Sequence, residues 1–518
     1  MVKHSIENQN STLSLLLYLI IATGIFLAIY QFIFNRSLWI DEAMLAHNII
    51  SKDFLELLKP LDRNQAAPIG FLFVEKLSVL TFGKNEIALR LFPLISFLFT
   101  IPFFYLLSKK LTSNSIIALI STSFFTISLA ILRYSSEVKQ YPIDILFSMM
   151  ILYFTLTLQF NKNKSLLIYA IVGGTAIWFS NASVIILAVV GLYLLYSESY
   201  KNKNYKILLP FLFWLISFSI YYYFFVYNHP MTEFMKTVWS WAFIPLNPFS
   251  KDFYIFFYKS AITIYHLWGF PSYSVFIPMT ISLGTIIFII KSQKYTLLYF
   301  LLSPLILHLL LSGFEIYPFT GRFLLYTLPL IVLLYSYGLY YLFYFINNKI
   351  VKLNILLLLL PVLIMFYSIY LHFPIEIEET KKSLSYIERN IKKDETVYIY
   401  YGANDAYIFY KDSNIIDINN TIITGISFRF KGKDRKINNV IMTGTSFEFK
   451  EESRNNDDIL LDLTGKVWLL FSHVYPSNTA DNEEKYIVDF LLERGSKLIE
   501  VKKYKGSSVY YIDTMKSN

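Results

Sequence analysis

The sequence predicts a polytopic α-helical membrane protein that carries a small α/β domain at its C-terminal end. Its 518 residues are 55% hydrophobic and 16% charged, whereas soluble chains carry about 25% charged residues. Apolar runs near the length of a membrane helix, about 20 residues, recur between residues 13 and 373. From residue 376 onward they give way to segments with the patterns of short helices and strands.

The apolar runs predict about eleven membrane spans. The run 165–196 is too long for one span and is interrupted by "SNAS" at 180–183, so we expect two short spans that meet at Asn181. The other predicted spans are 13–34, 87–107, 114–132, 143–160, 207–227, 273–290, 295–312, 322–346 and 353–373.

Two further apolar stretches, 68–82 and 253–268, are short for a span and carry charged residues. We therefore expect them to lie as helices on the outer membrane surface. The short lysine-rich loops then all fall on the side of the N-terminus. Because cytoplasmic loops collect Lys and Arg, the pattern predicts a multi-pass plasma-membrane protein with a cytoplasmic N-terminus and an extracytoplasmic C-terminal domain. The net charge of +9 follows from this arrangement and does not indicate a nucleic-acid partner.

The composition divides the chain into a transmembrane domain, 1–375, whose first outer loop is 35–86, and an extracytoplasmic α/β domain, 376–518. In the second domain we expect helices at "IEETKKSLSYIERNI" and "EEKYIVDFLLERG", and strands at the start of "ETVYIYY" and at "GKVWLLFSHVYP". The segment "KLIEVKKYKGSSVYYID" predicts a strand pair that turns at Lys505–Gly506. The chain has no cysteine, which excludes disulfides, thiol chemistry and Cys-ligated zinc.

An acidic pair, Asp41 and Glu42, follows the first predicted span directly. In one interpretation the two acids stand in the first turn of an amphipathic helix, where carboxylates bind free N–H groups and complement the helix dipole. In the other, an acid at the membrane boundary is a general base for a hydroxyl substrate, which contributes about 10²–10⁴-fold in rate. Both hold if one acid caps the helix while its neighbour faces a cleft.

Other polar residues gather in the predicted outer loops. In "RYSSEVKQYP", Arg133 and Glu137 have the spacing of an i,i+4 pair at a helix end. Arg90 and Arg322 lie near the outer ends of spans, where they either snorkel to the interface or clamp an anionic headgroup with paired donors. The tryptophans of the loop 228–272 indicate an interfacial belt or a platform for a sugar.

Several of these stretches, in this order, resemble one known family. "WIDEA" comes first, then "LDRNQAAPIGFLFVEKLSVLTFGKNEIALRLFPLISFLFTIPFFYLLSKKL", then "RYSSEVKQYPIDILF", and later "GRFLLYTLPL". The set resembles the bacterial glycosyltransferase family 39-like membrane proteins, GT-C-fold relatives of the protein O-mannosyltransferases and the lipid A aminoarabinose transferases. The resemblance covers most of the chain.

The resemblance implies transfer of a sugar from a polyprenyl-phosphate carrier to an acceptor hydroxyl at the outer membrane face. It places the catalytic base at Asp41 and a supporting acid at Glu42. Substrate-binding roles carry over to Arg90, Glu137, Lys139, Tyr141 and Arg322.

One departure from the family concerns the segment "NQAAP". The aminoarabinose transferases have an acid and a lysine before paired prolines, whereas this chain has Gln65, two alanines and the single Pro68. The phosphate-contacting lysine is therefore missing there. The departure argues against lipid A as acceptor, leaves Gln65 as the substrate-binding candidate at this position, and moves the phosphate contact to Lys139 or the arginines.

The chemistry agrees with this interpretation. Phosphate is a good leaving group, so one base suffices for a single in-line displacement, which inverts the anomeric carbon without the carboxylate pair of a retaining glycosidase. A divalent cation near Asp41 and Glu137 is compatible with carboxylate ligands, but the sequence requires no cofactor. The expected partners are the lipid bilayer, a polyprenyl-phosphate-linked sugar and a glycan, lipid or protein acceptor.

Three other interpretations remain as alternatives. A transporter or lipid flippase places ionisable residues within its spans, whereas the charged residues here concentrate in the loops. A polysaccharide polymerase or ligase uses the same lipid carriers but lacks an acidic pair after its first span. An inactive scaffold would tolerate replacement of Asp41, which separates it from an enzyme.

Overall fold

The computed structural model describes residues 2–227, 229–347, 351–424, 435–437, 440–442, 460, 463–475 and 482–514. The chain forms two compact units. The first, which we call the helical unit, contains Met1–Phe34, Lys52–Thr81 and Ile87–Pro374. The second, the α/β unit, contains Asn35–Ser51, Phe82–Glu86 and Ile375–Asn518. These units cut the chain differently from the predicted domains 1–375 and 376–518, which stay a prediction.

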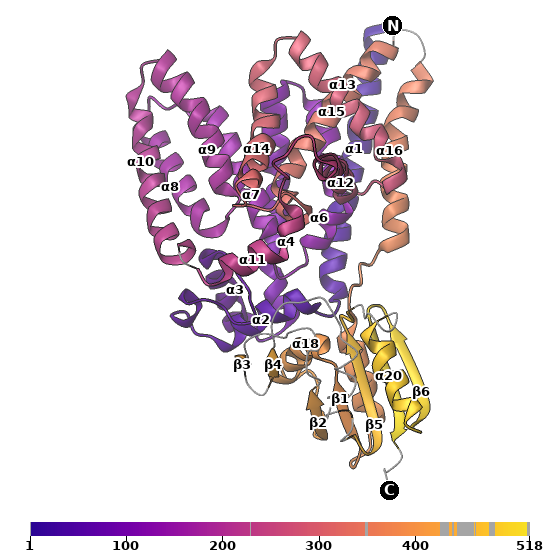
Figure 1. Ribbon diagram of the computed structural model, residues 1–518. Coiled ribbons are helices and arrows are strands. Elements are labelled where there is room, and N and C mark those ends of the chain that lie inside the picture. Colours follow the sequence, from indigo (N-terminus) through magenta and orange to yellow (C-terminus); the bar gives the residue numbers. More distant parts are fainter. Residues whose placement is uncertain are drawn as a thin grey trace. The chain divides into compact units, whose positions relative to one another are not determined.

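The helical unit consists of helices throughout (Figure 1). Their bounds are α1 Val2–Phe34, α3 Ile69–Phe82, α4 Glu86–Thr112, α5 Ser115–Thr126, α6 Leu129–Tyr134, α7 Tyr141–Thr157, α8 Asn163–Phe179, α9 Ser183–Leu194, α10 Leu208–Tyr221, α11 Met231–Val238, α12 Lys251–Trp268, α13 Phe276–Lys291, α14 Tyr295–Gly313, α15 Leu328–Asn347 and α16 Val351–His372. A 3-10 helix, η7, covers Gly321–Thr327 before α15.

The apolar helices make the chain a multi-pass membrane protein. Within the described residues, six helical segments are long and apolar enough to cross a membrane: Thr12–Phe34, Glu86–Thr112, Ser183–Lys201, Tyr205–Val226, Tyr295–Gly313 and Gly321–Leu342. Four shorter apolar helical segments are Ser115–Thr126, Tyr141–Thr157, Phe276–Lys291 and Leu360–His372. The number of spans, predicted as about eleven, and the cytoplasmic N-terminus stay predictions.

Two helix breaks show how local chemistry ends a helix. The break expected at Asn181 is confirmed, since α8 ends at Phe179 and α9 begins at Ser183. The Ser180 hydroxyl accepts the Ser183 N–H at 3.0 Å, which binds an N–H group that the helix leaves unpaired. The predicted span 114–132 is not one continuous helix, because α5 ends at Thr126 and α6 begins at Leu129. At this break the Ser128 hydroxyl donates to the Leu267 carbonyl at 3.1 Å.

The two stretches expected on the membrane surface are helical, and α3 and α12 are absent from the candidate spans found among the described residues.

Close packing in the helical unit uses small residues, as is common between membrane helices. α8 packs on α10 at Gly173 and Gly174. A Cβ atom at Gly173 would lie 2.3 Å from the Trp214 indole nitrogen, so only glycine fits there.

The α/β unit is built on a five-stranded sheet with the order β2-β1-β5-β7-β6 (Figure 1). β1 (Thr396–Ile399) is parallel to β2 (Thr421–Thr424) and β5 (Gly465–Ser472), whereas β7 (Ser507–Thr514) is antiparallel to β5 and to β6 (Lys497–Tyr504). The helices are α2 Ile40–Ser51, α17 Thr380–Asn390, α18 Tyr401–Asp412 and α20 Glu483–Glu493. A separate antiparallel pair joins β3 (Arg435–Ile437) and β4 (Val440–Met442).

The expected elements of this unit are confirmed. The predicted turn lies between β6 and β7, where Gly506 has φ +62°, a conformation that glycine adopts without strain. The second predicted helix, α20, is followed by Gly495 with φ +88°. The core between the sheet and α20 contains Val467, Leu469, Ile487 and Ile512, which are all completely buried. α2, which carries the acidic pair, packs against α18 of the same unit.

Candidate active site

The acidic pair lies in the first turn of α2, as the helix-start interpretation predicts. Asp41 is half-buried, and Glu42 is completely buried. The backbone N–H groups of Glu42 and Ala43 both donate to the carbonyl of Trp39, the residue just before α2, at 2.9 Å. The two neighbouring acids therefore have different surroundings.

Glu42 has the contacts of a structural carboxylate. Its Oε2 atom lies 2.6 Å from Arg36 Nη1, and the side chains of this pair are 0% and 1% exposed. The same oxygen accepts the Trp39 N–H at 3.5 Å, an arrangement like the glutamate of a capping box. These contacts hold the polypeptide that leads into α2 against the helix itself.

Residues near the start of the predicted C-terminal domain hold the same segment. Glu378 Oε2 accepts the Ile40 N–H at 2.9 Å, and Glu379 Oε2 accepts the Ser37 hydroxyl at 3.1 Å. The Tyr410 hydroxyl accepts the Leu38 N–H at 2.8 Å. Sequence reasoning missed all three residues, although "EIEET" is a visible run of acids just before α17.

In the helical unit, the second predicted outer loop forms a polar cluster between α6 and α7. Lys139 Nζ donates to Gln65 Oε1 at 3.0 Å, and both residues are buried. Two candidates from separate loops are thus brought together. The amide of Gln65 orients the ammonium group of Lys139 but contributes no charge of its own.

Arg133 and Glu137 form the expected i,i+4 ion pair. Arg133 Nε lies 3.0 Å from Glu137 Oε2, and the Glu137 side chain is 0% exposed while Arg133 is 32% exposed. α7 begins at Tyr141 with Pro142 in its first turn, which is the position where proline suits a helix. The ion pair therefore fixes the turn that presents Lys139 and Tyr141.

Arg322, from η7, lies against aromatic rings. Its guanidinium is 5.4 Å from the centre of the Trp239 ring and 5.9 Å from that of Tyr141. Such cation–π contacts are worth about 0.5–2 kcal/mol. Arg322 and Tyr141 are thus brought together, and the loop tryptophan Trp239 joins them. Arg90, on α4, is only 1% exposed, so it does not snorkel to water.

Six of the eight candidates therefore belong to the helical unit, and five of these, Gln65, Glu137, Lys139, Tyr141 and Arg322, lie in or contact the segment 133–141. Arg90 is the sixth, and Asp41 and Glu42 belong to the α/β unit. In the described parts of the chain, no group of three or more His, Asp or Glu could hold a metal ion.

Two buried carboxylates in helices were not singled out from the sequence. Asp144 in α7 is 4% exposed and is hydrogen-bonded by the Ser180 side chain and the Ala182 backbone. Glu75 in α3 is 0% exposed. From the sequence, Glu75 counted only as one of the charges in the stretch 68–82 and Asp144 was not considered, so burial is what distinguishes the two acids.

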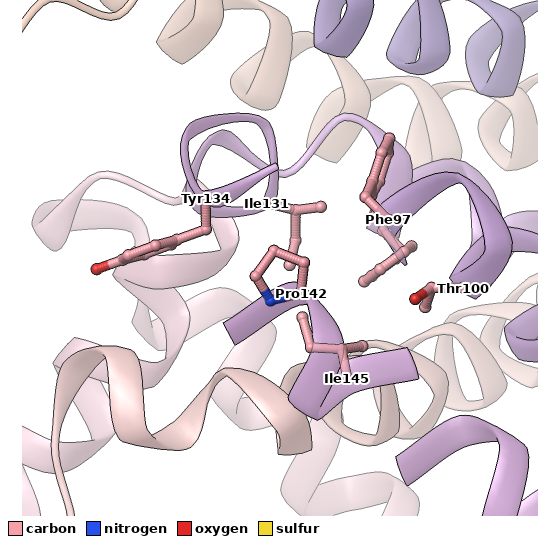
Figure 2. A pocket seen from close by; sticks show the side chains of 7 residues that line it. Phe97, Thr100, Ile131, Tyr134, Pro142 and Ile145 are labelled. Carbon is pink, nitrogen blue, oxygen red and sulfur yellow. The ribbon is translucent and has the colours of Figure 1, made fainter. Parts of the chain in front are cut away.

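A small gap lies next to the polar cluster. Figure 2 shows the residues that line it, among them Tyr134 of α6, Pro142 and Ile145 of α7, and Phe97 and Thr100 of α4. The gap has a volume of about 10 Å³, which is close to the space for one water molecule. It does not accommodate a prenyl chain.

Comparison with known proteins supports the predicted resemblance. Residues 66–224 match the family described as dolichyl-phosphate-mannose-protein mannosyltransferase. The search of curated proteins finds no match. The matched region contains Arg90 and the whole segment 133–141, whereas Asp41, Glu42, Gln65 and Arg322 lie outside it.

Solved structures give the fold. ArnT from Cupriavidus metallidurans in the apo state has a TM-score of 0.52 and 9% identity, over 95% of this chain and 97% of that one. The same protein bound to undecaprenyl phosphate has a TM-score of 0.53 and 11% identity, over 96% and 98%. At these identities the likeness establishes the fold alone. The chain thus has the fold of ArnT, and its residues 66–224 match the mannosyltransferase family.

Proposed function

We propose that the chain is an integral-membrane glycosyltransferase that moves a sugar from a polyprenyl-phosphate carrier to an acceptor hydroxyl on the outer membrane face. The observation that carries the proposal is the buried polar cluster around segment 133–141, in which Lys139 and Arg322 offer cations within a unit made of apolar helices. A lipid-linked phosphate needs cations beside a hydrophobic slot. The solved structure of ArnT with undecaprenyl phosphate, which shares this fold, supports a lipid carrier of that class.

In this proposal Asp41 is the general base. The acceptor oxygen attacks the anomeric carbon, its proton passes to the Asp41 carboxylate, and the bond between that carbon and the phosphate oxygen breaks. The polyprenyl phosphate leaves with the electron pair, and Lys139 and the arginines stabilise its charge. A single displacement of this kind inverts the anomeric carbon. Arg90, Gln65, Glu137 and Tyr141 orient the donor, and no step requires a metal ion.

Glu42 supports this chemistry indirectly. Its carboxylate is occupied by Arg36 and by the start of α2, whereas Asp41 stands one position earlier and is half-buried. In this proposal the two adjacent acids of one first turn therefore have different roles. Glu42 holds the turn, and Asp41 is the base.

Lipid mass spectrometry on host cells carrying the wild-type protein or Asp41→Asn tests the proposal. We expect the variant to accumulate a polyprenyl-phosphate sugar that the wild type consumes, because loss of a general base costs about 10²–10⁴-fold in rate. Asp62→Asn is a matched control, since Asp62 is a half-exposed acid in the same predicted loop that pairs with Lys52. Identical lipid profiles for wild type and Asp41→Asn, at equal protein levels in the membrane, would favour transport or a structural role.

A further inference from the structure

A pocket of about 430 Å³ lies within the α/β unit. Its wall includes Glu378 before α17, His473 after β5, Glu484 in the first turn of α20, and Lys503, Tyr504 and Ser508 around the β6–β7 turn. The volume falls in the range of about 300–1,000 Å³ that is usual for small-molecule sites. No function proposed so far uses this pocket.

The polar groups of the pocket are held in place by one another. His473 Nδ1 lies 2.6 Å from Glu378 Oε1, and Glu378 is only 7% exposed. Across the pocket, Glu484 Oε1 accepts the hydroxyls of Ser508 at 2.8 Å and Tyr510 at 2.7 Å. Fixed carboxylates and hydroxyls in a concave site give a ligand a defined orientation.

The chemistry of the wall suits a polyhydroxylated ligand. Two carboxylates, Glu378 and Glu484, line the wall together with an imidazole and the exposed ammonium of Lys503, so the wall carries charges of both signs. Carboxylates accept hydrogen bonds from ligand hydroxyls, and ammonium and serine groups donate to them. The Tyr504 ring adds an aromatic surface for the C–H face of a sugar ring. A lipid phosphate or a nucleic acid would require a basic wall instead.

The same pocket is joined to the helix that carries Asp41. Glu378 contributes Oε1 to the contact with His473, while its Oε2 accepts the N–H of Ile40, the residue before Asp41. A molecule that occupies the pocket therefore contacts the residue that fixes the first turn of α2.

We infer that this pocket binds the sugar portion of the acceptor, so that the acceptor is a glycan or glycolipid. This inference rests on the proposed function, because only a transferase has an acceptor. It deepens that function by naming the class of the acceptor substrate. β6 is an edge strand, where a peptide could add as a further strand. The pocket lies instead at the turn end of β6, away from most of that edge, which favours a sugar over a peptide.

Saturation-transfer NMR on the full-length protein in nanodiscs tests the inference without requiring turnover. The probes are methyl β-D-glucopyranoside, methyl β-D-galactopyranoside and an acetylated Ser/Thr hexapeptide. We expect signal transfer to at least one glycoside, and an at least five-fold loss of it in Lys503→Ala and in Glu484→Gln. Lys497→Ala is the matched control, because Lys497 is also exposed, lies at the opposite end of β6 and should retain the signal.

The outcomes are distinct. Glycoside signals that are absent, or that are unchanged in both pocket variants, overturn the inference. Binding of the peptide alone, lost in the same variants, also overturns it and makes the pocket a peptide site. The donor-lipid measurement on Asp41→Asn is independent of these spectra. If that variant leaves cellular lipids unchanged while the pocket variants lose glycoside binding, the proposed transferase fails and the sugar site stands.

Discussion

Glu378 accepts a hydrogen bond from the backbone N–H of Ile40 at 2.9 Å, although 338 positions separate the two residues. Ile40 is the first residue of α2, and its N–H is one of those that a helix leaves unpaired. Hydrogen bonds to charged groups contribute about 1.5–3 kcal/mol, and a carboxylate at this end also complements the helix dipole. The turn that carries Asp41 therefore depends on a residue from the C-terminal part of the chain.

Glu378→Ala should loosen this turn without removing either acid. We expect at least a ten-fold fall in sugar transfer, together with faster hydrogen exchange of the amides in residues 37–43, because the Ile40 N–H loses its acceptor. Glu376→Ala is the control, since Glu376 is a partly exposed acid two positions away that pairs with Lys382. Exchange at wild-type rates in Glu378→Ala would show that the contact does not position α2.

Variants of the buried Arg36–Glu42 ion pair should change the thermal stability of the protein. Breaking a buried ion pair costs about 3–5 kcal/mol, whereas replacing both partners by apolar residues is often neutral. Glu42→Ala should therefore lower the unfolding temperature strongly, and Arg36→Met/Glu42→Leu should recover most of the loss. Thermal scans of the full-length protein measure this, with Asp41→Asn expected to melt like the wild type. Equal destabilisation by the single and the double variants would contradict the structural role of Glu42.

Much of the fold could be predicted because membrane helices and alternating strands leave local patterns. The break at Asn181 and the turn at Lys505–Gly506 are examples in which a few neighbouring residues decide the structure. The break between α5 and α6 was missed, because "FFTISLA" contains no proline, glycine or charged residue, and the contact that Ser128 makes at the break is with Leu267, far away in the sequence.

In the candidate site, too, local contacts could be predicted from the sequence and long-range contacts could not. Arg133 and Glu137 pair as their spacing predicts, and Asp41 and Glu42 begin a helix as acids commonly do. The partners Glu378 and Tyr410 could not be found, because no local pattern links residues more than 300 positions apart. Asp144 was missed for another reason: its hydrogen-bond partners, Ser180 and Ala182, lie in the break between α8 and α9, more than 30 positions away.

Lys139 gives a test of donor binding in the helical unit. Lys139→Met removes a buried ammonium while keeping most of the side-chain volume, so we expect the KM for the polyprenyl-phosphate sugar to rise at least ten-fold. Lys139→Arg should recover part of the affinity, because the charge is restored but the 3.0 Å contact with Gln65 is altered. Lys59→Met, at an exposed lysine of the same unit, is the control. An unchanged KM in Lys139→Met would move the phosphate contact to the arginines.

The surroundings of Glu395 indicate how the thermal stability of the α/β unit depends on pH. Its carboxylate is 5% exposed and accepts hydrogen bonds from the Tyr511 hydroxyl at 2.5 Å, the Trp468 indole at 2.8 Å and the Lys392 N–H at 3.0 Å. Burial raises the pKa of Glu395, but these hydrogen bonds outweigh it, and the pKa lies below its ordinary value of 4.5. A carboxyl with a lowered pKa in the folded state stabilises the fold above its unfolded pKa, and that contribution is lost as the pH falls through the folded pKa.

Glu395→Gln should therefore lower the unfolding temperature of the α/β unit at pH 7, and the difference from wild type should shrink as the pH falls below about 4.5. Thermal scans of the full chain between pH 7 and pH 3.5, followed by proteolysis within 376–518, measure this. Asp394→Asn is the matched control, because Asp394 is the exposed acid immediately before Glu395 and should leave the pH profile unchanged. A difference between Glu395→Gln and wild type that stays constant across this range would mean that the hydrogen bonds do not depend on the charge of Glu395.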